Sequence, residues 1–335
     1  MDRRLVRGEP TSRPGPLACQ TSAVTVLAEV IRSGFHECEH HGSMIAVDAD
    51  GNELLRAGEP ERPIFPRSSN KPLQALGMLR AGLAVPPDQL AIASASHSGE
   101  QMHVDRVRRV LAGAGLTEAD LQCPPSWPAD EPTHQRLFRA GAAPSRVRMN
   151  CSGKHAGMLA TCVAAGWPIG DYLDPEHPLQ QQIRQTAEEL TGETCAAVGV
   201  DGCGAPLFAF TLVGLARAFS RIATAPAGTH EHQLAAAVRA HPELISGTDR
   251  PDRALAAGVP GLFAKGGAEA CYVAALPDGR SIALKITDGG DRARGVVLAE
   301  ALRRLGVDQP MVREQLTMPV YGGGRVVGQV RATAW

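Results

Sequence analysis

The segment ACYVAALPDGRSIALKI, residues 270–286, indicates the fold class of this chain. Two apolar runs flank the turn signal PDG, and this pattern predicts a β-hairpin. A second hairpin is predicted near the other end, where the apolar run 44–47 meets the turn signal DADG and a return strand follows at Leu54 and Leu55. Strands at both ends with helices between them predict an α+β fold. We expect an antiparallel sheet built from N- and C-terminal segments, packed with helices, with a mainly helical region inserted.

Hydrophobic spacing and turn residues predict the elements between the two hairpins. We expect strands at residues 24–31 and 90–93. Helices are expected from Ser68 onward, over 101–111, from Ser152 onward, over 179–190, after Cys203 through Phe210 to Ala216, and over 292–305. The proline-rich segment 123–144 is predicted to be irregular and is a candidate substrate-binding region.

Composition limits the organisation and the partners of the chain. Residues 1–21 are polar and rich in proline, and we expect a flexible tail followed by a single catalytic domain over 22–335. A formal net charge of −1 gives no electrostatic footprint for nucleic acid. With no long apolar run and no apolar leader, no membrane partner and a cytoplasmic location are predicted. The eight cysteines are expected to be thiols rather than a disulfide framework.

The chain contains only four lysines, and three of them lie in dense polar motifs. These three are Lys71 in RSSNKP, Lys154 in NCSGKH and Lys265 in AKGG, whereas Lys285 lies in an apolar run. An ammonium can lose its proton in a buried site, but a guanidinium effectively cannot. A neutral lysine can act as a base or as a metal ligand. The placement of the lysines therefore points to catalysis.

The spacing Ser68-x-x-Lys71 at a predicted helix start places both side chains on one face. A neutral Lys71 could take the proton of Ser68 and produce an activated nucleophile. The neighbouring Arg67 could lower the pKa of that lysine or hold a substrate carboxylate. The competing interpretation is a serine helix cap followed by a solvated lysine.

Two weaker motifs point to the same kind of site. Ser96 and His97 follow a predicted buried strand, at a position where catalytic side chains are often displayed. His97 on its own is more often a packed or exposed histidine. Lys265-Gly266-Gly267 resembles the Lys-Thr-Gly element of penicillin-recognising enzymes, although it is also an ordinary turn.

Cys151 and Cys203 differ from the other cysteines because their neighbours are polar and glycine-rich. Two thiolates favour Zn²⁺, and a third ligand could be Lys154, His155 or Asp201. The spacing matches no standard zinc-finger pattern. Metal binding and ordinary buried thiols are both compatible with these residues.

Together these segments resemble the asparaginase II family, the class 3 or rhizobial-type L-asparaginases. The stretch NCSGKHAGML at 150–159 is the most specific match, and the order and separation of the motifs fit over about residues 22–335. The resemblance implies a fold similar to serine β-lactamases and glutaminases. It also implies hydrolysis of L-asparagine to L-aspartate and ammonia, by a homodimer.

The resemblance also implies roles for individual residues. Catalysis is expected from two serine–lysine pairs, Ser68 with Lys71 and Ser96 with Lys265. The zinc ligands are expected to be Cys151, Lys154 and Cys203, with Arg67, His155 and Asp201 as substrate-binding residues beside them. The zinc is expected to help hold the substrate rather than to activate water.

Two other functions remain open from the sequence. A penicillin-recognising hydrolase or a glutaminase would use a similar serine and lysine arrangement, but a Ser-Asp-Asn element is missing. A zinc-stabilised amino-acid-binding protein without catalysis is the other alternative. Nucleotide-cofactor chemistry is disfavoured, because neither a dinucleotide-binding nor a P-loop glycine pattern occurs.

Overall fold

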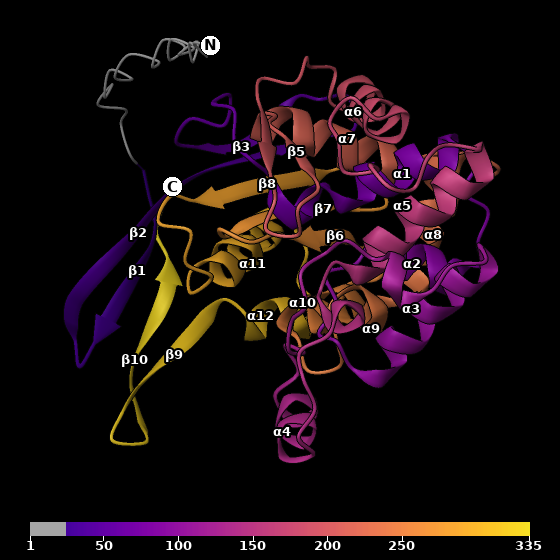
Figure 1. The fold of residues 1–335 in the computed structure, drawn as a ribbon. Helices are drawn as coiled ribbons and strands as arrows, with labels where there is room; N and C mark the ends of the chain where they lie inside the picture. Colours follow the sequence, from indigo (N-terminus) through magenta and orange to yellow (C-terminus); the bar gives the residue numbers. More distant parts are fainter. Residues whose placement is uncertain (1–24) are drawn as a thin grey trace, which may run out of the picture.

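The computed structural model describes residues 25–335, so the tail predicted at residues 1–21 lies outside the described residues. The described chain folds into an eight-stranded antiparallel sheet with helices around it (Figure 1). Strands from both ends of the chain form this sheet, and most helices come from the region between them. The α+β fold predicted from the two hairpins is confirmed.

The large sheet has the order β6-β7-β8-β2-β1-β10-β9, with β3 paired to β2. Its strands are β1 (Thr25–Arg32), β2 (Phe35–Val47), β3 (Glu53–Ala57), β6 (Phe263–Gly266), β7 (Cys271–Ala275), β8 (Ser281–Ile286), β9 (Thr317–Gly322) and β10 (Arg325–Ala332). The predicted hairpins are β2–β3 and β7–β8, and they join where Met44 of β2 lies opposite Leu284 of β8. A separate ribbon pairs β4 (Val198–Val200) with β5 (Pro206–Phe208).

Helices occupy most of the remaining chain. The 3₁₀ helices are η1 (Arg67–Asn70), η2 (Glu118–Asp120) and η3 (Arg146–Arg148). The α-helices are α1 (Lys71–Arg80), α2 (Pro87–Ala93), α3 (Gln101–Gly113), α4 (Glu131–Arg139), α5 (Ser152–Ala165), α6 (Pro178–Thr191), α7 (Leu212–Ala223), α8 (His230–Ala240), α9 (Pro242–Ile245), α10 (Pro251–Gly258), α11 (Arg294–Arg304) and α12 (Pro310–Glu314). Among these described helices, none is long and apolar enough to cross a membrane.

Both faces of the sheet are buried around β7, β8 and the end of β2, each in its own hydrophobic core. Alternate residues of a strand point to opposite faces. Ile45 and Val47 of β2 pack with the inserted helices, whereas Met44 and Ala46 pack in a second core with α11. The continuous apolar runs of β2, β7 and β8 follow from this two-sided burial.

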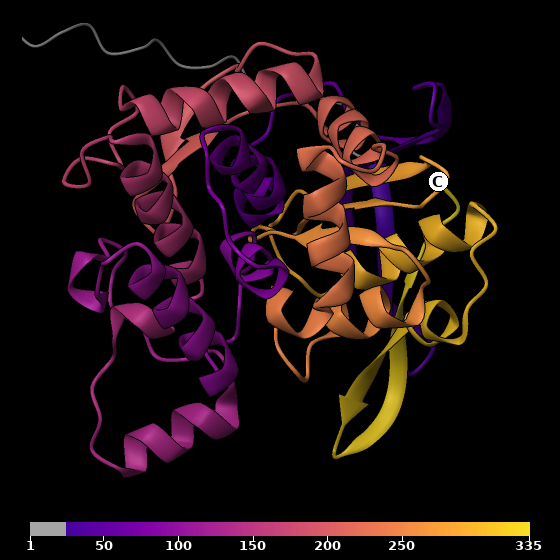
Figure 2. The same cartoon turned by 90° about the vertical axis from the view of Figure 1, so that its right-hand side faces the viewer.

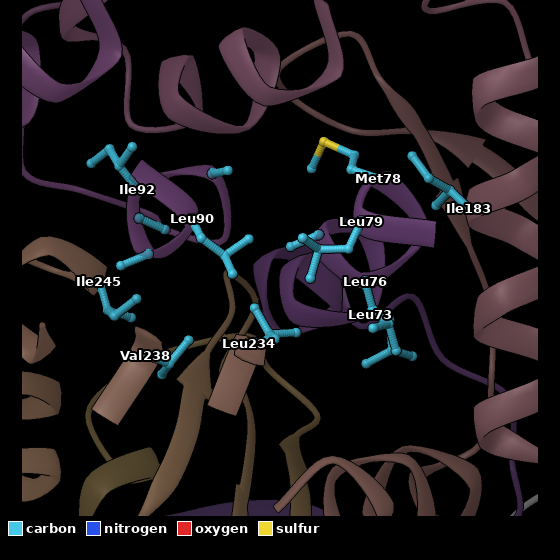
Figure 3. Packing of buried hydrophobic residues seen from close by; sticks show 14 of the residues in the cluster. Leu73, Leu76, Met78, Leu79, Leu90, Ile92, Ile183, Leu234, Val238 and Ile245 are labelled. Atoms are coloured by element: carbon cyan, nitrogen blue, oxygen red, sulfur yellow. The ribbon is translucent and has the colours of Figure 1, made fainter. Parts of the chain in front are cut away.

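The first core is centred on α1, α2, α6 and α8, as Figure 3 shows in close view. Helices α1 and α6 approach very closely at Gly77. A side-chain carbon at Gly77 would lie 2.8 Å from the Cα of Ile183, so only glycine fits there. This packing holds the start of α1 in a fixed place relative to the rest of the helical region.

The strand predicted at 90–93 is wrong, because this run forms the end of helix α2. Pro87 occupies the first turn of α2 and Asp88 follows it, a composition typical of helix starts. Periodicity cannot distinguish a strand from a buried helix over four apolar residues.

The helix predicted from Cys203 to Ala216 is also wrong in its first half. Residues Pro206–Phe208 form strand β5, and α7 begins only after Thr211, whose hydroxyl accepts a hydrogen bond from the Gly214 amide. A threonine in this position is a strong helix start signal. The segment 123–144, expected to be irregular, contains α4, which begins at the Asp130 cap. Figures 1 and 2 both show α4 projecting away from the body of the protein.

Candidate active site

The four candidate catalytic residues come from separate elements that meet at the edge strand β6. Ser68 lies in η1, Lys71 begins α1, Ser96 follows α2, and Lys265 lies on β6. Ser68, Ser96 and Lys265 line one cavity of about 650 Å³, and Lys71 is buried in its wall. The structure thus brings together residues that are up to 197 positions apart in sequence, counting from Ser68 to Lys265.

Lys71 contacts Ser96 and not, as predicted, Ser68. Its Nζ donates to the Ser96 Oγ over 2.9 Å and to the Ala95 carbonyl oxygen over 2.5 Å. The carbonyl oxygen of Asn150 lies 3.5 Å away. A buried ammonium requires acceptors, and these backbone carbonyls draw the amine towards the turn after α2. The expected hydrogen-bond pairing of Ser68 with Lys71 is therefore corrected to Ser96 with Lys71.

Lys265 is buried, and its Nζ donates to the Gly266 carbonyl oxygen over 2.7 Å. It does not make the hydrogen bond to Ser96 that the sequence predicted. Burial, together with the positive charge of Lys71, lowers the pKa of Lys265 to about 7. Asp252 opposes this shift from the other side of the strand. The cavity therefore contains an amine that is half neutral near pH 7.

The backbone of η1 lies directly against the loop that follows β6. A side-chain carbon at Gly267 would lie 2.7 Å from the Pro66 carbonyl oxygen and 3.3 Å from the Ser68 amide nitrogen. The loop can come this close only because residue 267 is glycine. Ser68 is consequently held in a narrow space between η1 and the loop after β6.

A second group of polar side chains lies at the start of α5. Sulfur atoms of Cys151 and Cys203 and a carboxylate oxygen of Asp201 lie within 4.8 Å of one another. The Nζ of Lys154 donates to the Cys203 sulfur over 3.1 Å. All four candidate ligands thus converge, as the sequence motifs predicted, although they come from two segments 47 residues or more apart.

Charge in this group is concentrated on Cys151. A hydrogen bond from Cys203 holds the pKa of the Cys151 thiol well below its ordinary value, despite burial, and raises the pKa of Cys203. Burial lowers the pKa of Lys154, but the negative charges of its neighbours outweigh burial and raise it. A metal ion would take the place of this proton, since a ligating lysine must be neutral.

These residues fit a zinc ion. Two thiolates with a nitrogen or carboxylate ligand form a donor set that Zn²⁺ prefers. His155 adds a further observation: its Nδ1 lies 2.7 Å from the Tyr172 hydroxyl, while its Nε2 is buried and has no hydrogen-bond partner. Burial lowers the pKa of His155, so the ring is neutral and a nitrogen lone pair is available beside Cys203.

Arg67 does not face the cavity that contains the two serines. Its Nε donates to Asp201 over 2.8 Å and its Nη1 to Glu269 over 3.3 Å. Arg67 and Glu269 line a different cavity of about 570 Å³ on the side of β4 and β5. In the structure Arg67 makes ion pairs that join η1 to the metal-ligand group, and its contact with substrate stays a prediction.

Sequence reasoning missed several residues of the cavity. Arg294 donates to the Gly267 carbonyl oxygen over 3.1 Å and pairs with Asp252 at 3.3 Å, and so braces the loop after β6. No local motif marks either residue. His97, which the sequence did indicate beside Ser96, is buried, and its Nε2 lies 2.9 Å from Ser152 Oγ. The hydroxyl of Ser152 donates to the Val147 carbonyl oxygen, so His97 must be the donor in this contact.

Comparisons with known proteins give one family and several distant structures. The sequence model of the family described as L-asparaginase II matches residues 28–332. A search of curated proteins found no match. Three solved structures are partly similar. Mglu in its native form is 16% identical over 80% of this chain and 63% of that chain, with a TM-score of 0.43. A beta-lactamase from Mycobacterium bovis is 15% identical over 78% of this chain and 94% of that chain (TM-score 0.42), and a hydrolase with promiscuous acyltransferase activity is 13% identical over 84% of this chain and 93% of that chain (TM-score 0.43). The chain spans 63% of the length of the first of these.

Proposed function

Because the chain belongs to the L-asparaginase II family, whose model covers residues 28–332, we propose that it hydrolyses the side-chain amide of L-asparagine to L-aspartate and ammonia. The observation that carries this proposal is the contact of the Lys71 amine with Ser96 in the wall of the cavity that contains Ser68 and Lys265. A serine next to a buried amine is one arrangement that supports nucleophilic amide hydrolysis.

The proposed reaction is a double displacement. The Ser68 oxygen forms a bond with the amide carbon while its proton passes to the amine of Lys71, which would turn from its Ser96 contact towards Ser68 for this step. Lys71 returns a proton through Ser96, 2.9 Å away, to the nitrogen of the breaking C–N bond, and ammonia leaves. A water molecule then gives a proton to Lys71 as its oxygen bonds to the carbonyl carbon of the β-aspartyl ester. The C–O bond to Ser68 breaks, Lys71 returns the proton to the Ser68 oxygen, and aspartate is released.

Backbone amides would stabilise the negative charge that develops on the carbonyl oxygen. The Ser68 amide lies where η1 contacts the Gly267 loop, in the same residue as the side-chain oxygen that would form the ester. Fixed N–H donors aimed at a developing oxyanion typically contribute a factor of about 10²–10³ in rate. The Arg294 and Asp252 brace would keep this loop in position.

We propose that Cys151, Lys154 and Cys203 hold a zinc ion, with Asp201 and His155 beside it. When bound, zinc would supply a positive charge that attracts the carboxylate of an amino-acid substrate. The 2.8 Å contact with Arg67 orients the Asp201 carboxylate. Burial alone would raise the pKa of Asp201, but the positive charges of Lys154 and Arg67 outweigh burial and hold this pKa below its ordinary value. These residues would therefore bind and orient substrate rather than carry the reacting proton.

The test is ammonia release from L-asparagine, L-glutamine and a chromogenic β-lactam, with and without a metal chelator. We expect rapid release from asparagine and slower or no release from glutamine. Turnover of the β-lactam without turnover of asparagine would favour a penicillin-recognising hydrolase. Tight binding of asparagine with no ammonia would favour the non-catalytic binding protein.

The family resemblance also leads us to propose a homodimer. Sedimentation velocity would check this directly, with a dimer expected at about 71 kDa, twice the chain mass of 35.3 kDa. A single 35 kDa species across the concentration range would exclude it.

A further inference from the structure

Lys285 is the one lysine of the sequence that lies outside the candidate catalytic residues and the candidate metal ligands. It lies half-buried on β8, an interior strand, opposite Cys271 of β7 and Ser43 of β2. Its Nζ donates to the carbonyl oxygen of Glu269 over 2.5 Å and to that of Ile286 over 3.3 Å. The side chain therefore reaches from β8 over the turn that connects β6 with β7.

That turn has an unfavourable backbone conformation. Glu269 and Ala270 have φ values of +57° and +52°, in the left-handed region that residues with a side chain seldom adopt. Among the described residues other than glycine, only Ser33 and Arg67 share a positive φ. Such a backbone persists only where its surroundings hold it. The ammonium of Lys285 on the Glu269 carbonyl is a contact of that kind.

The same turn contacts the segment that carries the candidate nucleophile. The carboxylate of Glu269 accepts a hydrogen bond from Arg67, the residue before Ser68, which is itself left-handed with a φ of +52°. Two residues earlier, Gly267 packs on the Ser68 amide. Arg67 in turn donates a hydrogen bond to the Asp201 carboxylate, so the turn is linked through Arg67 to Asp201. A movement of the turn would therefore change the position of both the η1 backbone and Asp201.

We propose that Lys285 is a positioning residue for amide hydrolysis, whose ammonium fixes the turn 267–270 against Arg67 and the backbone of Ser68. The proposal rests on the proposed function, because it assigns Ser68 a place in the reaction. The hydrogen bonds of Lys285 go to backbone carbonyl oxygens and not to Lys71 or Lys265. Its contribution comes from the two backbone carbonyl groups that it binds, and so depends on its N–H donors rather than on its aliphatic stem.

The matched variants are Lys285→Met, which keeps the stem and removes the donors, and Lys285→Arg, which keeps donors at the same place. Arg303→Met serves as the control, since it removes one cation from an exposed ion pair with Glu300 on α11. We expect Lys285→Met to lower kcat for asparagine about tenfold or more with KM changed less than about threefold, because misplacement of reacting groups affects the chemical step. Lys285→Arg should recover most of this loss. A Lys285→Met enzyme with wild-type kcat would overturn the proposal, as would a Lys285→Arg enzyme as slow as Lys285→Met.

A second measurement separates this proposal from the proposed function. A fluorophosphonate probe phosphonylates an activated serine, with fluoride as the leaving group and without any need for an amide substrate, and mass spectrometry identifies the labelled residue. Labelling of Ser68 should be about tenfold slower in Lys285→Met than in wild type and in Arg303→Met. If wild type releases no ammonia from asparagine, the proposed function is wrong, and the labelling rates still decide the role of Lys285. Equal labelling in all variants, or no labelling of Ser68 in wild type, would refute the positioning role.

Discussion

The Nζ of Lys71 lies 2.9 Å from the Oγ of Ser96, although 25 residues separate them in the sequence. The same amine is 2.5 Å from the Ala95 carbonyl oxygen, so the lysine is fixed on the turn after α2. This contact places a titratable amine and a hydroxyl in the wall of one cavity, and it leads to the first prediction.

Lys71→Met should reduce kcat for asparagine by about 10²–10⁴-fold, the usual contribution of a positioned base. Lys71→Arg should be as inactive, because a guanidinium does not give up its proton at any accessible pH. Steady-state ammonia release measures both variants. Substantial activity in Lys71→Arg would show that this side chain acts only through its positive charge.

The two serines should respond differently to substitution. Ser68→Ala removes the proposed nucleophile and should abolish both turnover and covalent labelling by a fluorophosphonate. Ser96→Ala interrupts only proton return to the departing nitrogen, so turnover should fall while labelling of Ser68 persists. Near-normal turnover in Ser68→Ala together with none in Ser96→Ala would reverse the two roles.

The rate should rise with pH through about 7. Burial and the nearby Lys71 charge lower the pKa of Lys265 to about 7, so above this pH the two-lysine site carries one proton fewer. Lys265 lines the same cavity as Ser68, so a second, neutral amine that can accept a proton beside the nucleophile becomes available as the pH increases. A plot of kcat/KM against pH should show a rising limb with a midpoint near 7, since this parameter reports groups of the free enzyme.

Lys265→Gln should remove that limb, because the titrating amine is lost while a polar side chain remains. The control is His97→Asn, since burial already keeps His97 neutral throughout this range by lowering its pKa well below the ordinary value. The rise of kcat/KM near pH 7 should therefore persist in His97→Asn, whatever the absolute rate of that variant. A wild-type profile that is flat from pH 6 to 8 would contradict the assignment to Lys265.

Zinc content should depend on the thiols at the start of α5 and on no other cysteine of the described chain. Elemental analysis of the purified protein should find about one zinc per chain, and Cys151→Ser or Cys203→Ser should lose it. Cys195→Ser is the matched control, because that thiol donates to the Ala197 carbonyl oxygen and lies outside the ligand group. Retention of zinc in Cys151→Ser would exclude the proposed ligand set.

The close approach of α1 and α6 predicts opposite effects for two glycine-to-alanine changes. A Cβ at Gly77 would lie 2.8 Å from the Ile183 backbone, so Gly77→Ala should destabilise the protein by about 1–3 kcal/mol through overpacking. Gly113, at the end of α3, has open space around it, so Gly113→Ala should be neutral or stabilise by up to about 1 kcal/mol. Urea unfolding measures both free energies, and equal effects would contradict the packing argument.

The sequence was sufficient for residues whose partners lie within one turn of chain. The thiol and lysine of NCSGKH lie at one helix start, and the hairpins around PDG and DADG are set by local turn chemistry. Residue types unusual for their surroundings, such as a rare lysine or a glycine-flanked cysteine, also identified most members of the site.

Partners that depend on tertiary packing could not be found in this way. Ser96 was expected to pair with Lys265, but the direction of the Lys71 side chain is decided by carbonyl groups that α2 and η3 bring to it. Arg294 and Asp252 are ordinary surface-type residues in the sequence, and only the fold places them on the Gly267 loop. The four-residue run at Leu90 carried no periodicity from which helix could be distinguished from strand.

The pairing of β1 with β10 has a consequence for how the chain is made. Ala28 lies opposite Ala332, so the sheet cannot be completed until the 304 residues that follow Ala28, up to Ala332 (332 − 28), have been synthesised. At about 5–20 residues per second, β1 waits on the order of 15–60 s for its partner strand, with one hydrogen-bonding edge open to other chains. β6, the strand that carries Lys265, also reaches β2 only through β7 and β8, which are translated late. Ribosome-bound chains that stop before β8 should therefore contain the packed helices but lack a complete catalytic cavity, and their exposed β1 and β2 would be a natural target for chaperones.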